Sequence, residues 1–180
     1  VEDITFYTKE GMIIDNKQDI LRQRLLAFEY GAKIKIDSAH STFGGGAANV
    51  SIAAKSLGLK SACICAVGDD DRGKRIVKNL KSKRIDTRFI QKIKKEMSGF
   101  SFLLVGQENE HVIFSHRAAN AKLRIAENSL KKITAEWIYI TSLSGNWKEV
   151  LKNIFSQAEK SKIAWNPGHI QLSENPSLIR

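Results

Sequence analysis

The stretch TFGGGAANVSIAAKSLG, residues 42–58, places three consecutive glycines before a pattern that predicts a helix. Apolar residues recur at the spacing of one helix face: Val50, Ala53, Ala54 and Leu57. Gly58 then stands where a helix end favours a left-handed residue. Because glycine costs backbone entropy on folding, three in a row indicate that something must come close to the backbone.

Two kinds of phosphate-binding loop do not match this run. A dinucleotide fingerprint needs a third glycine where Asn49 stands, and the preceding SAHSTF is a poor strand. A Walker A loop needs Gly-Lys-Ser or Gly-Lys-Thr after the glycines, and the sequence has neither there. Bare amides at a helix N-terminus, with one carbonyl acceptor and two donors from Asn49, suit a neutral polyol. A tight turn with Asn49 as a local cap remains the alternative.

The rest of the chain alternates between predicted strands and helices. We expect strands at 4–8, 31–36, 62–67, 100–105, 111–115, 137–141 and from 163, and helices at 47–57, after 68–71, and at 127–133 and 146–160. From residue 43 onward the alternation predicts a mainly parallel sheet sandwiched by helices. The strand at 31–36 and the hairpin at 100–115 do not fit that alternation. They predict a small second sheet that projects from the first.

Composition sets broad limits on the protein. A chain of 180 residues, 42% of them hydrophobic, is long enough for one domain with a real core. The sequence has no apolar run near the roughly 18 residues of a membrane span, and its N-terminus lacks a secretory pattern. We therefore expect a cytoplasmic protein without a membrane partner. Because the chain begins with Val1 inside a β-like run and ends at Arg180 after a turn-rich segment, we expect a fold truncated at both ends.

The cysteines and histidines predict neither a disulfide nor a metal site. Cys63 and Cys65 lie two residues apart in an apolar run, which is poor spacing for a bridge within one strand. The four histidines are scattered, without the spacing that metal ligands usually show.

The charge is strongly basic, with 29 Lys and Arg against 19 Asp and Glu and a net charge of +10. Such an excess suggests anionic partners, but the clusters at 81–84, 92–95 and 131–132 are separate, and no aromatic residues interleave with them. We interpret them as a solvated surface and expect no nucleic-acid partner. A nucleic-acid-binding protein is the weakest alternative, and salt-sensitive binding to unrelated oligonucleotides would revive it.

Four segments together resemble the ribokinase-like (PfkB) carbohydrate kinases: FGGGAANVSIAAKSLG, AVGDDDRGKRIVKNLKSKRIDT, SGFSFLLVGQENEHVIFSHRAANAKL and AWNPG. The N-terminal signature of the family matches Gly44-Gly45, Asn49, Leu57-Gly58, Gly68-Asp69-Asp70 and Gly73. Two weaker motifs follow at Arg84-Ile85-Asp86-Thr87 and Ala118-Ala119-Asn120, where Arg84 and Ala118 replace glycines of the family. The resemblance covers nearly the whole chain.

The resemblance implies a single partial ribokinase-like domain over 1–180, with an α/β sheet and a small β-sheet lid formed by strands at about 3–8, 31–36 and 100–115. It implies ATP-dependent phosphorylation of a sugar hydroxyl with Mg²⁺, and possible homodimers through the lid. The substrate-binding residues that it implies are Asp3, Gly45, Gly46, Asn49, Ser101 and Leu103.

The catalytic motif of the family, Asp-Thr-x-Gly-Ala-Gly-Asp, does not occur in these 180 residues. In the family its last Asp is the general base, and its glycine amides form the anion hole. The resemblance therefore places no catalytic residue and no metal ligand in this chain, leaves the ATP-binding residues unknown, and implies a sugar-binding portion that does not turn over alone. Two alternatives stay open: a nucleoside kinase of the adenosine type, and a non-catalytic sugar-binding module.

Overall fold

The structure, a computed structural model, describes residues 1–180 except 131–132, 158 and 175–180. The chain forms two compact units. We call Val1, 44–99 and 117–180 the α/β unit, and 2–43 and 100–116 the β unit. No helix among the described residues has the length and apolar character that would let it cross a membrane.

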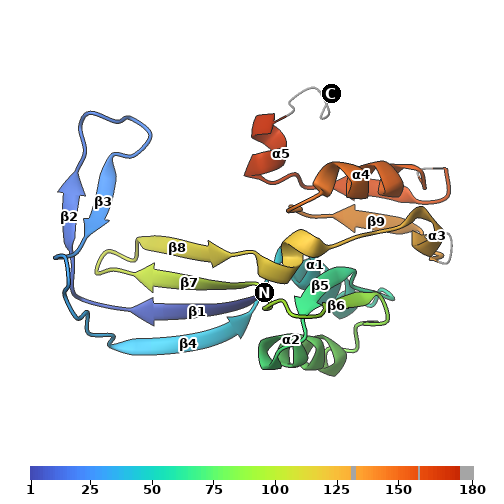
Figure 1. Cartoon of the computed structure of the whole chain (residues 1–180), viewed down its shortest axis with the longest axis horizontal. Coiled ribbons are helices and arrows are strands. Elements are labelled where there is room, and N and C mark those ends of the chain that lie inside the picture. Colours follow the sequence, from blue (N-terminus) through green and yellow to red (C-terminus); the bar gives the residue numbers. More distant parts are fainter. Residues whose placement is uncertain (131–132, 158, 175–180) are drawn as a thin grey trace. The chain divides into compact units, whose positions relative to one another are not determined.

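The β unit is built on a four-stranded sheet with the order β4-β1-β7-β8 (Figure 1). Its strands are β1 (Glu2–Tyr7), β4 (Ser38–Phe43), β7 (Phe100–Val105) and β8 (His111–His116). Strand β1 pairs antiparallel with β4 and parallel with β7, and β7 pairs antiparallel with β8. A separate antiparallel hairpin joins β2 (Met12–Asp15) to β3 (Arg24–Ala27).

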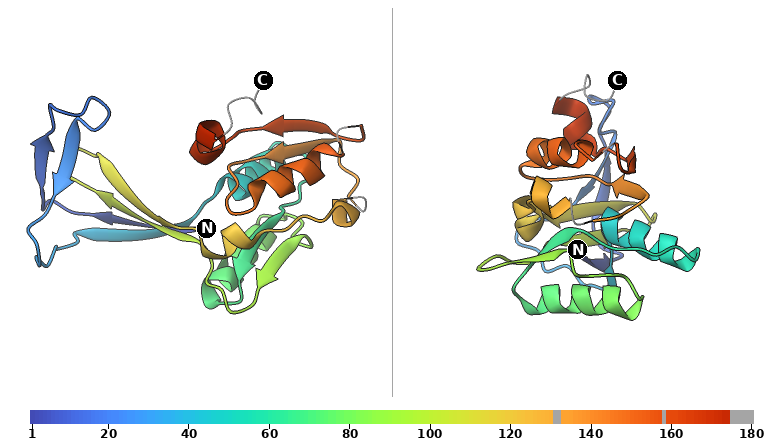
Figure 2. Two further views of the ribbon diagram at one scale, coloured as in Figure 1. Left: turned by 45° about the horizontal axis from the view of Figure 1, so that its top comes forward. Right: turned by 90° about the vertical axis from the view of Figure 1, so that its right-hand side faces the viewer.

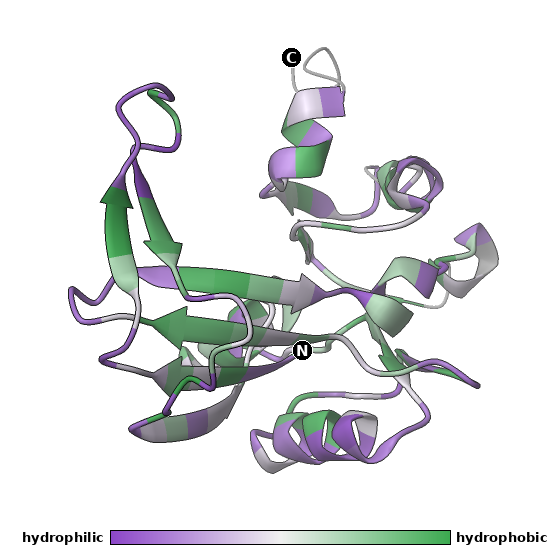
Figure 3. Ribbon diagram, turned by 60° about the vertical axis from the view of Figure 1, so that its left-hand side comes forward, coloured by the Kyte–Doolittle hydropathy of each residue, from purple (hydrophilic) through white to green (hydrophobic). Residues whose placement is uncertain are grey.

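The two faces of this sheet differ in chemistry, because successive side chains of a strand point to opposite sides. One face carries the aromatic residues Phe6, Phe100 and Phe102, whose rings contact each other at centroid distances of 5.8 and 5.1 Å. Much of the length of these strands is hydrophobic (Figure 3). The prediction that Phe100 and Phe102 share one face of the hairpin is therefore confirmed.

The α/β unit contains two parallel strand pairs, each with a helix alongside (Figure 2). The first pair is β5 (Cys65–Gly68) with β6 (Ile90–Ile93), connected through α2 (Asp71–Ser82). The second is β9 (Trp137–Ile140) with β10 (Lys162–Trp165), connected through α4 (Trp147–Phe155). The remaining elements are α1 (Gly46–Ser56), the 3₁₀ helix η1 (Ala118–Lys122), α3 (Glu127–Leu130) and α5 (His169–Glu174).

The core of the α/β unit forms where α4 packs against both strand pairs. Trp147, Val150, Leu151 and Ile154 of α4 are at most 5% exposed, at the helical spacing that the sequence predicts. They cluster with Ile140 of β9 and Ala66 of β5. Each such side chain contributes about 1.5–3 kcal/mol of burial free energy, so this one helix face secures much of the unit.

Both α1 and α2 end in the same Schellman arrangement, in which two amides bond back to the last turn. At α1 the amide of Gly58 donates to Lys55 and that of Leu59 to Ala54. At α2 the left-handed position is Arg84, with a φ of 59°. Ala118, at the start of η1, also has a positive φ, of 42°. Arg84 and Ala118 thus replace the family's glycines at backbone positions that favour glycine.

Most predicted elements are confirmed, among them the strand near 4–8, the hairpin at 100–115 and the helix over 47–57. The lid strand predicted at 31–36 is wrong: Lys35 is held by hydrogen bonds with Thr8 and Glu10, and the segment has no partner strand. SAHSTF, judged a poor strand, is β4 instead, because six pairings with β1 outweigh its polar composition.

Other differences concern short elements. The sequence did not predict β2, β3, β6 and α5. Helix α4 ends at Phe155, five residues before the predicted end, and Ala158, expected on its apolar face, lies outside the described residues. The helix predicted over 127–133 is described only as far as Leu130.

One hydrogen-bond network fixes the start of α2. The Asp70 carboxylate caps the helix by accepting from the Gly73 amide at 2.8 Å, and it also accepts from the amide and hydroxyl of Ser98 at 2.9 and 2.6 Å. The Ser98 hydroxyl, fully buried, accepts in turn from the Gly68 amide at 2.9 Å. Added Cβ atoms at Gly68 and Gly73 would lie 2.3 Å from backbone oxygens, so glycine is required at both.

This network predicts a pH-dependent stability. Burial opposes ionisation of Asp70, but the hydrogen bonds from Ser98 and Gly73 outweigh it and lower the pKa of the carboxyl. The stability that Asp70 contributes is therefore fully present above the unfolded pKa of about 3.9, and is lost as the pH falls through the lower folded pKa. At pH 7 we expect Asp70→Ala to cost about 1–2 kcal/mol, the usual loss for a helix cap.

Chemical denaturation of the unaltered chain and of Asp70→Ala between pH 7 and pH 2 measures the difference between their free energies of unfolding. This difference should shrink below about pH 4. Asp71→Ala is the matched control, because Asp71 is exposed and pairs with the exposed Lys74. A loss for Asp71→Ala as large as that for Asp70→Ala would contradict the network.

Candidate functional site

A row of polar side chains crosses one face of the β-unit sheet. Strand register places Thr42, Asp3, Ser101 and Ser115 directly side by side on β4, β1, β7 and β8. Partners in adjacent strands project to the same face, so one carboxylate and three hydroxyls share a line across four strands. Two of them, Asp3 and Ser101, are residues that the resemblance implies for substrate binding.

The next row on the same face is more apolar. It contains His40, Thr5, Leu103 and Ile113, in the same strand order. Leu103 is thus the diagonal neighbour of Asp3, one strand across and two residues along. A polar row beside a leucine offers hydrogen bonds to hydroxyls together with an apolar contact for carbon atoms.

The three glycines lie at the first turn of α1 in the α/β unit. Gly45 is the N-cap residue, with a φ of 96° that disfavours other residues. The backbones of Gly44 and Val1 exchange two hydrogen bonds of 3.1 and 3.2 Å. No side chain caps this helix, so its first amides can serve a ligand.

Gly46 is also needed for packing. An added Cβ would lie 2.8 Å from the Cβ of Thr141, the residue that follows β9. Two structural features therefore require glycine here: the left-handed backbone at Gly45 and the close helix–strand contact at Gly46. Close approach to the backbone is confirmed here, with Thr141 as the partner at Gly46.

Asn49 lies one turn into α1, and its side chain is exposed. Within the described part of the chain its amide group makes no side-chain hydrogen bond, and α1 has no side-chain cap. The alternative of Asn49 as a local cap is therefore wrong. Its amide shares the first turn with the free amides of the helix and can both donate and accept.

The carboxyl ends of β9 and β10 meet close to Gly46. Gly168, after β10, packs on Ser142, after β9, where an added Cβ would lie 2.1 Å from the hydroxyl oxygen. Gln171, 1% exposed, accepts from the Gly168 amide at 2.8 Å and donates to the Leu143 carbonyl at 2.7 Å. Carboxyl ends of parallel strands are where ligands bind in open α/β sheets. Sequence reasoning did not find Gln171, since a lone glutamine gives no pattern.

The predicted site residues thus fall into two sets. Asp3, Ser101 and Leu103 share one face of the β unit. Gly45, Gly46 and Asn49 share the first turn of α1 in the α/β unit. Hydroxyls that the sequence did not suggest, Thr42 and Ser115, extend the first set, and only strand register could identify them.

Cys63 and Cys65 are free thiols in the α/β unit. A hydrogen bond with Cys65 lowers the pKa of Cys63 to about 7 and raises that of Cys65. Cys63 is only 1% exposed, which keeps it away from reagents in solution. Among the described residues, no group of three or more His, Cys, Asp or Glu is placed to hold a metal ion.

The contact between Gly46 and Thr141 predicts that a single methyl group at the start of α1 is costly. Gly46→Ala would force the helix away from β9, and we expect a loss of about 1–3 kcal/mol in the free energy of unfolding, typical of overpacking. Thermal or urea unfolding measures it.

Gly106→Ala is the control, since the nearest atom to its added Cβ is 3.9 Å away and its φ is not positive. Equal stabilities for Gly46→Ala and the unaltered protein would mean that the first turn of α1 does not need its close contact with β9.

Three comparisons place the chain among known proteins. The family model described as pfkB family carbohydrate kinase matches residues 13–170. The chain is 34% identical over 90 residues to a ribokinase of Mus musculus. These 90 residues are 50% of this chain and 27% of that protein.

Among solved structures, a ribokinase from Cryptococcus neoformans in complex with ADP matches with a TM-score of 0.70 and 18% identity, over 97% of this chain and 50% of that one. A nucleoside kinase of Burkholderia thailandensis in complex with inosine matches with a TM-score of 0.69 and 13% identity, over 93% and 49%. The chain thus spans about half the length of these two structures.

Proposed function

Because this chain belongs to the pfkB family of carbohydrate kinases, we propose that it binds the sugar in the ATP-dependent phosphorylation of a sugar hydroxyl. The observation that carries the proposal is the polar row Thr42, Asp3, Ser101 and Ser115 across the β-unit sheet. In the α/β unit, the amides and Asn49 at the first turn of α1 are the further residues that the resemblance implies for sugar binding.

The chemistry of the row suits a polyol. A carboxylate such as Asp3 accepts from two adjacent sugar hydroxyls at once, and the hydroxyls of Ser101 and Thr42 can donate or accept as each sugar oxygen requires. Leu103 supplies an apolar contact for the sugar carbons. Asn49 and the α1 amides provide further donors, and the positive end of the helix favours electronegative oxygens.

The chain joins these two sets over short stretches of sequence. Asp3 follows Val1 by two residues, and the Val1 backbone pairs with Gly44 beside the glycine turn. Thr42, the partner of Asp3 in the sheet, precedes Gly45 by three residues. The two sets of residues that the resemblance implies for substrate binding are thus close together in the sequence at this point.

ATP and Mg²⁺ are the phosphoryl donor and the metal that the family implies. Among the described residues no group of three or more His, Cys, Asp or Glu is placed to hold a metal ion, and the Asp-Thr-x-Gly-Ala-Gly-Asp motif does not occur in these 180 residues, so we assign neither ATP nor Mg²⁺ to residues of this chain. We derive no transfer step from this chain. Its proposed contribution is to bind and orient the sugar, and we expect no turnover from these 180 residues alone.

The identity to a ribokinase supports a sugar over a nucleoside as the substrate. A nucleoside kinase is the same-fold alternative, and a sugar-binding module without catalysis is the other. The match to a nucleoside kinase of Burkholderia thailandensis, at 13% identity, shows the fold alone, and both alternatives are outcomes of the experiment below.

Binding of ribose, fructose and adenosine to the chain, measured by calorimetry, tests the proposed site. We expect Asp3→Asn to weaken sugar binding at least tenfold, because the neutral amide can no longer accept two charge-assisted hydrogen bonds. Asp15→Asn is the matched control, with the same change of charge on the exposed hairpin strand β2. Equal losses for both variants, or none for Asp3→Asn, would remove Asp3 from the site.

Phosphorylation assays with ATP on the full-length protein distinguish the substrate classes. Phosphorylation of adenosine but not of sugars would overturn the proposed sugar substrate. Sugar binding by the chain, with no ATP-dependent phosphorylation by the full-length protein, would favour the binding module.

We also propose that a second copy of the chain packs on the aromatic face of the β-unit sheet. This face carries Phe6, Phe100 and Phe102, with Phe114 of β8 58% exposed beside them. The first three rings are half-buried, so Phe114 is the exposed part of this apolar face, and exposed apolar patches mark interaction sites.

Phe114→Asp should shift the chain toward the monomer, as measured by analytical ultracentrifugation over a concentration series. Ile113→Asp, on the opposite face of β8, is the control. A monomeric unaltered chain at all concentrations would contradict the proposal.

A further inference from the structure

Almost all of the net charge of the chain lies in one segment. Residues 71–95, which form α2, the turn after it and β6, contain eleven Lys and Arg but only two Asp, a net charge of +9 out of +10. The rest of the chain is thus nearly neutral. Two of the clusters that looked separate in the sequence, 81–84 and 92–95, belong to one helix and to the strand and turns that follow it in the α/β unit, and the third, 131–132, lies outside the described residues.

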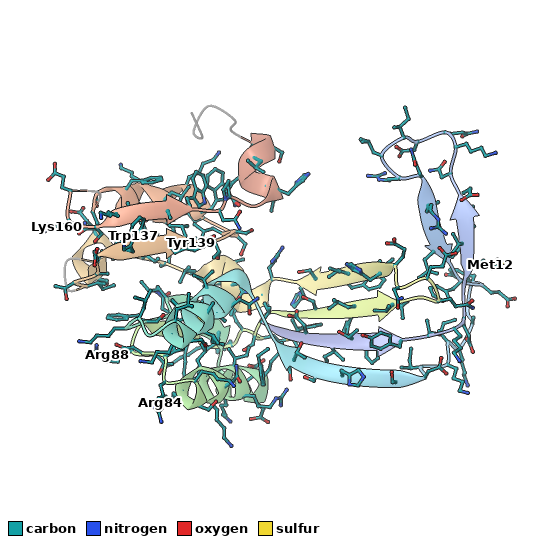
Figure 4. The ribbon with its side chains drawn as sticks, turned by 180° about the vertical axis from the view of Figure 1, so that it is seen from behind. Met12, Arg84, Arg88, Trp137, Tyr139 and Lys160 are labelled. Carbon is teal, nitrogen blue, oxygen red and sulfur yellow. The ribbon has the colours of Figure 1, made fainter. Side chains whose placement is uncertain are left out.

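Part of this charge lines a shallow surface pocket of about 300 Å³. Its lining residues are Lys74, Lys78 and Lys81 of α2, Lys92 of β6, and Val77. We call these four lysines the α2–β6 basic surface. The spacing of Lys74, Lys78 and Lys81 puts them on one side of the helix over about 10 Å. All four lysines are exposed, and Figure 4 shows two further cations, Arg84 and Arg88, in the same part of the unit.

The fold of α2 does not account for these lysines. Ile76 and Leu80 anchor the helix at 4% and 1% exposure, and Asp70 caps it. A cation near the C-terminus of a helix is stabilising, which explains Lys81 but not Lys74 or Lys78. Lys74 pairs with Asp71 at 2.8 Å. Within the described ranges no acidic side chain pairs with Lys78, Lys81 or Lys92. A solubilising surface normally mixes both signs of charge.

We propose that the α2–β6 basic surface binds the phosphate backbone of a nucleic-acid duplex, without reading its sequence. Three lysines over about 10 Å span about four successive phosphates of one strand, which are spaced about 3.4 Å apart along the duplex axis. Exposed lysines suit this partner, because their contribution comes from the release of counterions and does not need a buried site. The proposal is independent of the sugar site, which uses none of these lysines.

Other anionic partners fit the surface less well. A membrane-inserting helix needs exposed apolar residues, but Ile76 and Leu80 face the core and Val77 is half-buried. Single strands bind through aromatic stacking, but α2 has no aromatic residue, and Phe89 is half-buried with Arg88 over its ring at 5.6 Å. A regular line of phosphates remains the best match.

The test measures binding of a fluorescent 20-base-pair DNA duplex by anisotropy at 50–200 mM salt. Each lysine–phosphate contact contributes about 0.9 to the slope of log K against log salt, so we expect a slope at least as steep as about −3.6. A triple variant, Lys78→Gln, Lys81→Gln and Lys92→Gln, should flatten the slope by about 2.7 and weaken binding at least tenfold at 50 mM salt.

The matched control removes the same charge elsewhere in the α/β unit, through Lys60→Gln, Lys152→Gln and Lys160→Gln, which are exposed residues outside the surface. Its duplex affinity should stay within threefold of the unaltered chain. Equal weakening in both triple variants would show that net charge alone attracts the duplex and would overturn the proposal. Unchanged circular dichroism and sugar binding in the first variant confirm its fold and the independence of the two sites.

Two further measurements decide between classes of partner. Inorganic triphosphate and vesicles with 30% phosphatidylserine replace the duplex under the same conditions. Binding of either one that depends on Lys78, Lys81 and Lys92, with no binding of the duplex at 50 mM salt, would overturn the proposal in favour of a small-anion pocket or a membrane surface. Duplex binding that depends on these lysines supports the proposal.

Discussion

The hydrogen bonds between Asp70 and Ser98 are the constraint on which much of the α/β unit depends. They join the end of β5, the first turn of α2 and the segment after β6 through buried groups. Such close backbone approach requires Gly68 and Gly73, whose added Cβ atoms would meet backbone oxygens at 2.3 Å. The Gly-Asp-Asp-x-x-Gly spacing is therefore a packing motif, and its second carboxylate, that of Asp70, caps α2 and bonds to Ser98.

Left-handed backbone is supplied by glycine at some positions of this chain and by residues with side chains at others. At Gly45 it supplies a left-handed backbone, and at Gly46 it lets α1 approach Thr141. At Arg84 and Ala118 the same kind of backbone is occupied by residues with side chains, at φ values of 59° and 42°. The chain tolerates this strain because the Schellman bonds after α2 and the contact of buried Ala119 with Met97 hold each turn in place. Departures from the family pattern at these two positions thus affect stability and not the proposed site.

Chemistry is divided between the two faces of the β-unit sheet. One face presents the row from Thr42 to Ser115, and the other presents packed aromatic rings. The two-residue alternation of strands produces this division, so a single sheet presents hydrogen-bonding groups on one side and apolar surface on the other. The basic surface on α2 and β6 belongs to the α/β unit.

By itself the sequence determined the family, the α/β class, the main helices and the hairpin at 100–115, because these follow from local periodicity and from glycine motifs. It also identified Asp3, Ser101 and Asn49 as candidates. Strand pairing was decided only by the tertiary structure: β4 forms from a polar segment that β1 pairs with, and 31–36 stays unpaired despite a regular alternation. For the same reason Thr42 and Ser115 joined the candidate site only through register, since residues far apart in the chain become neighbours by hydrogen bonds that no local pattern encodes.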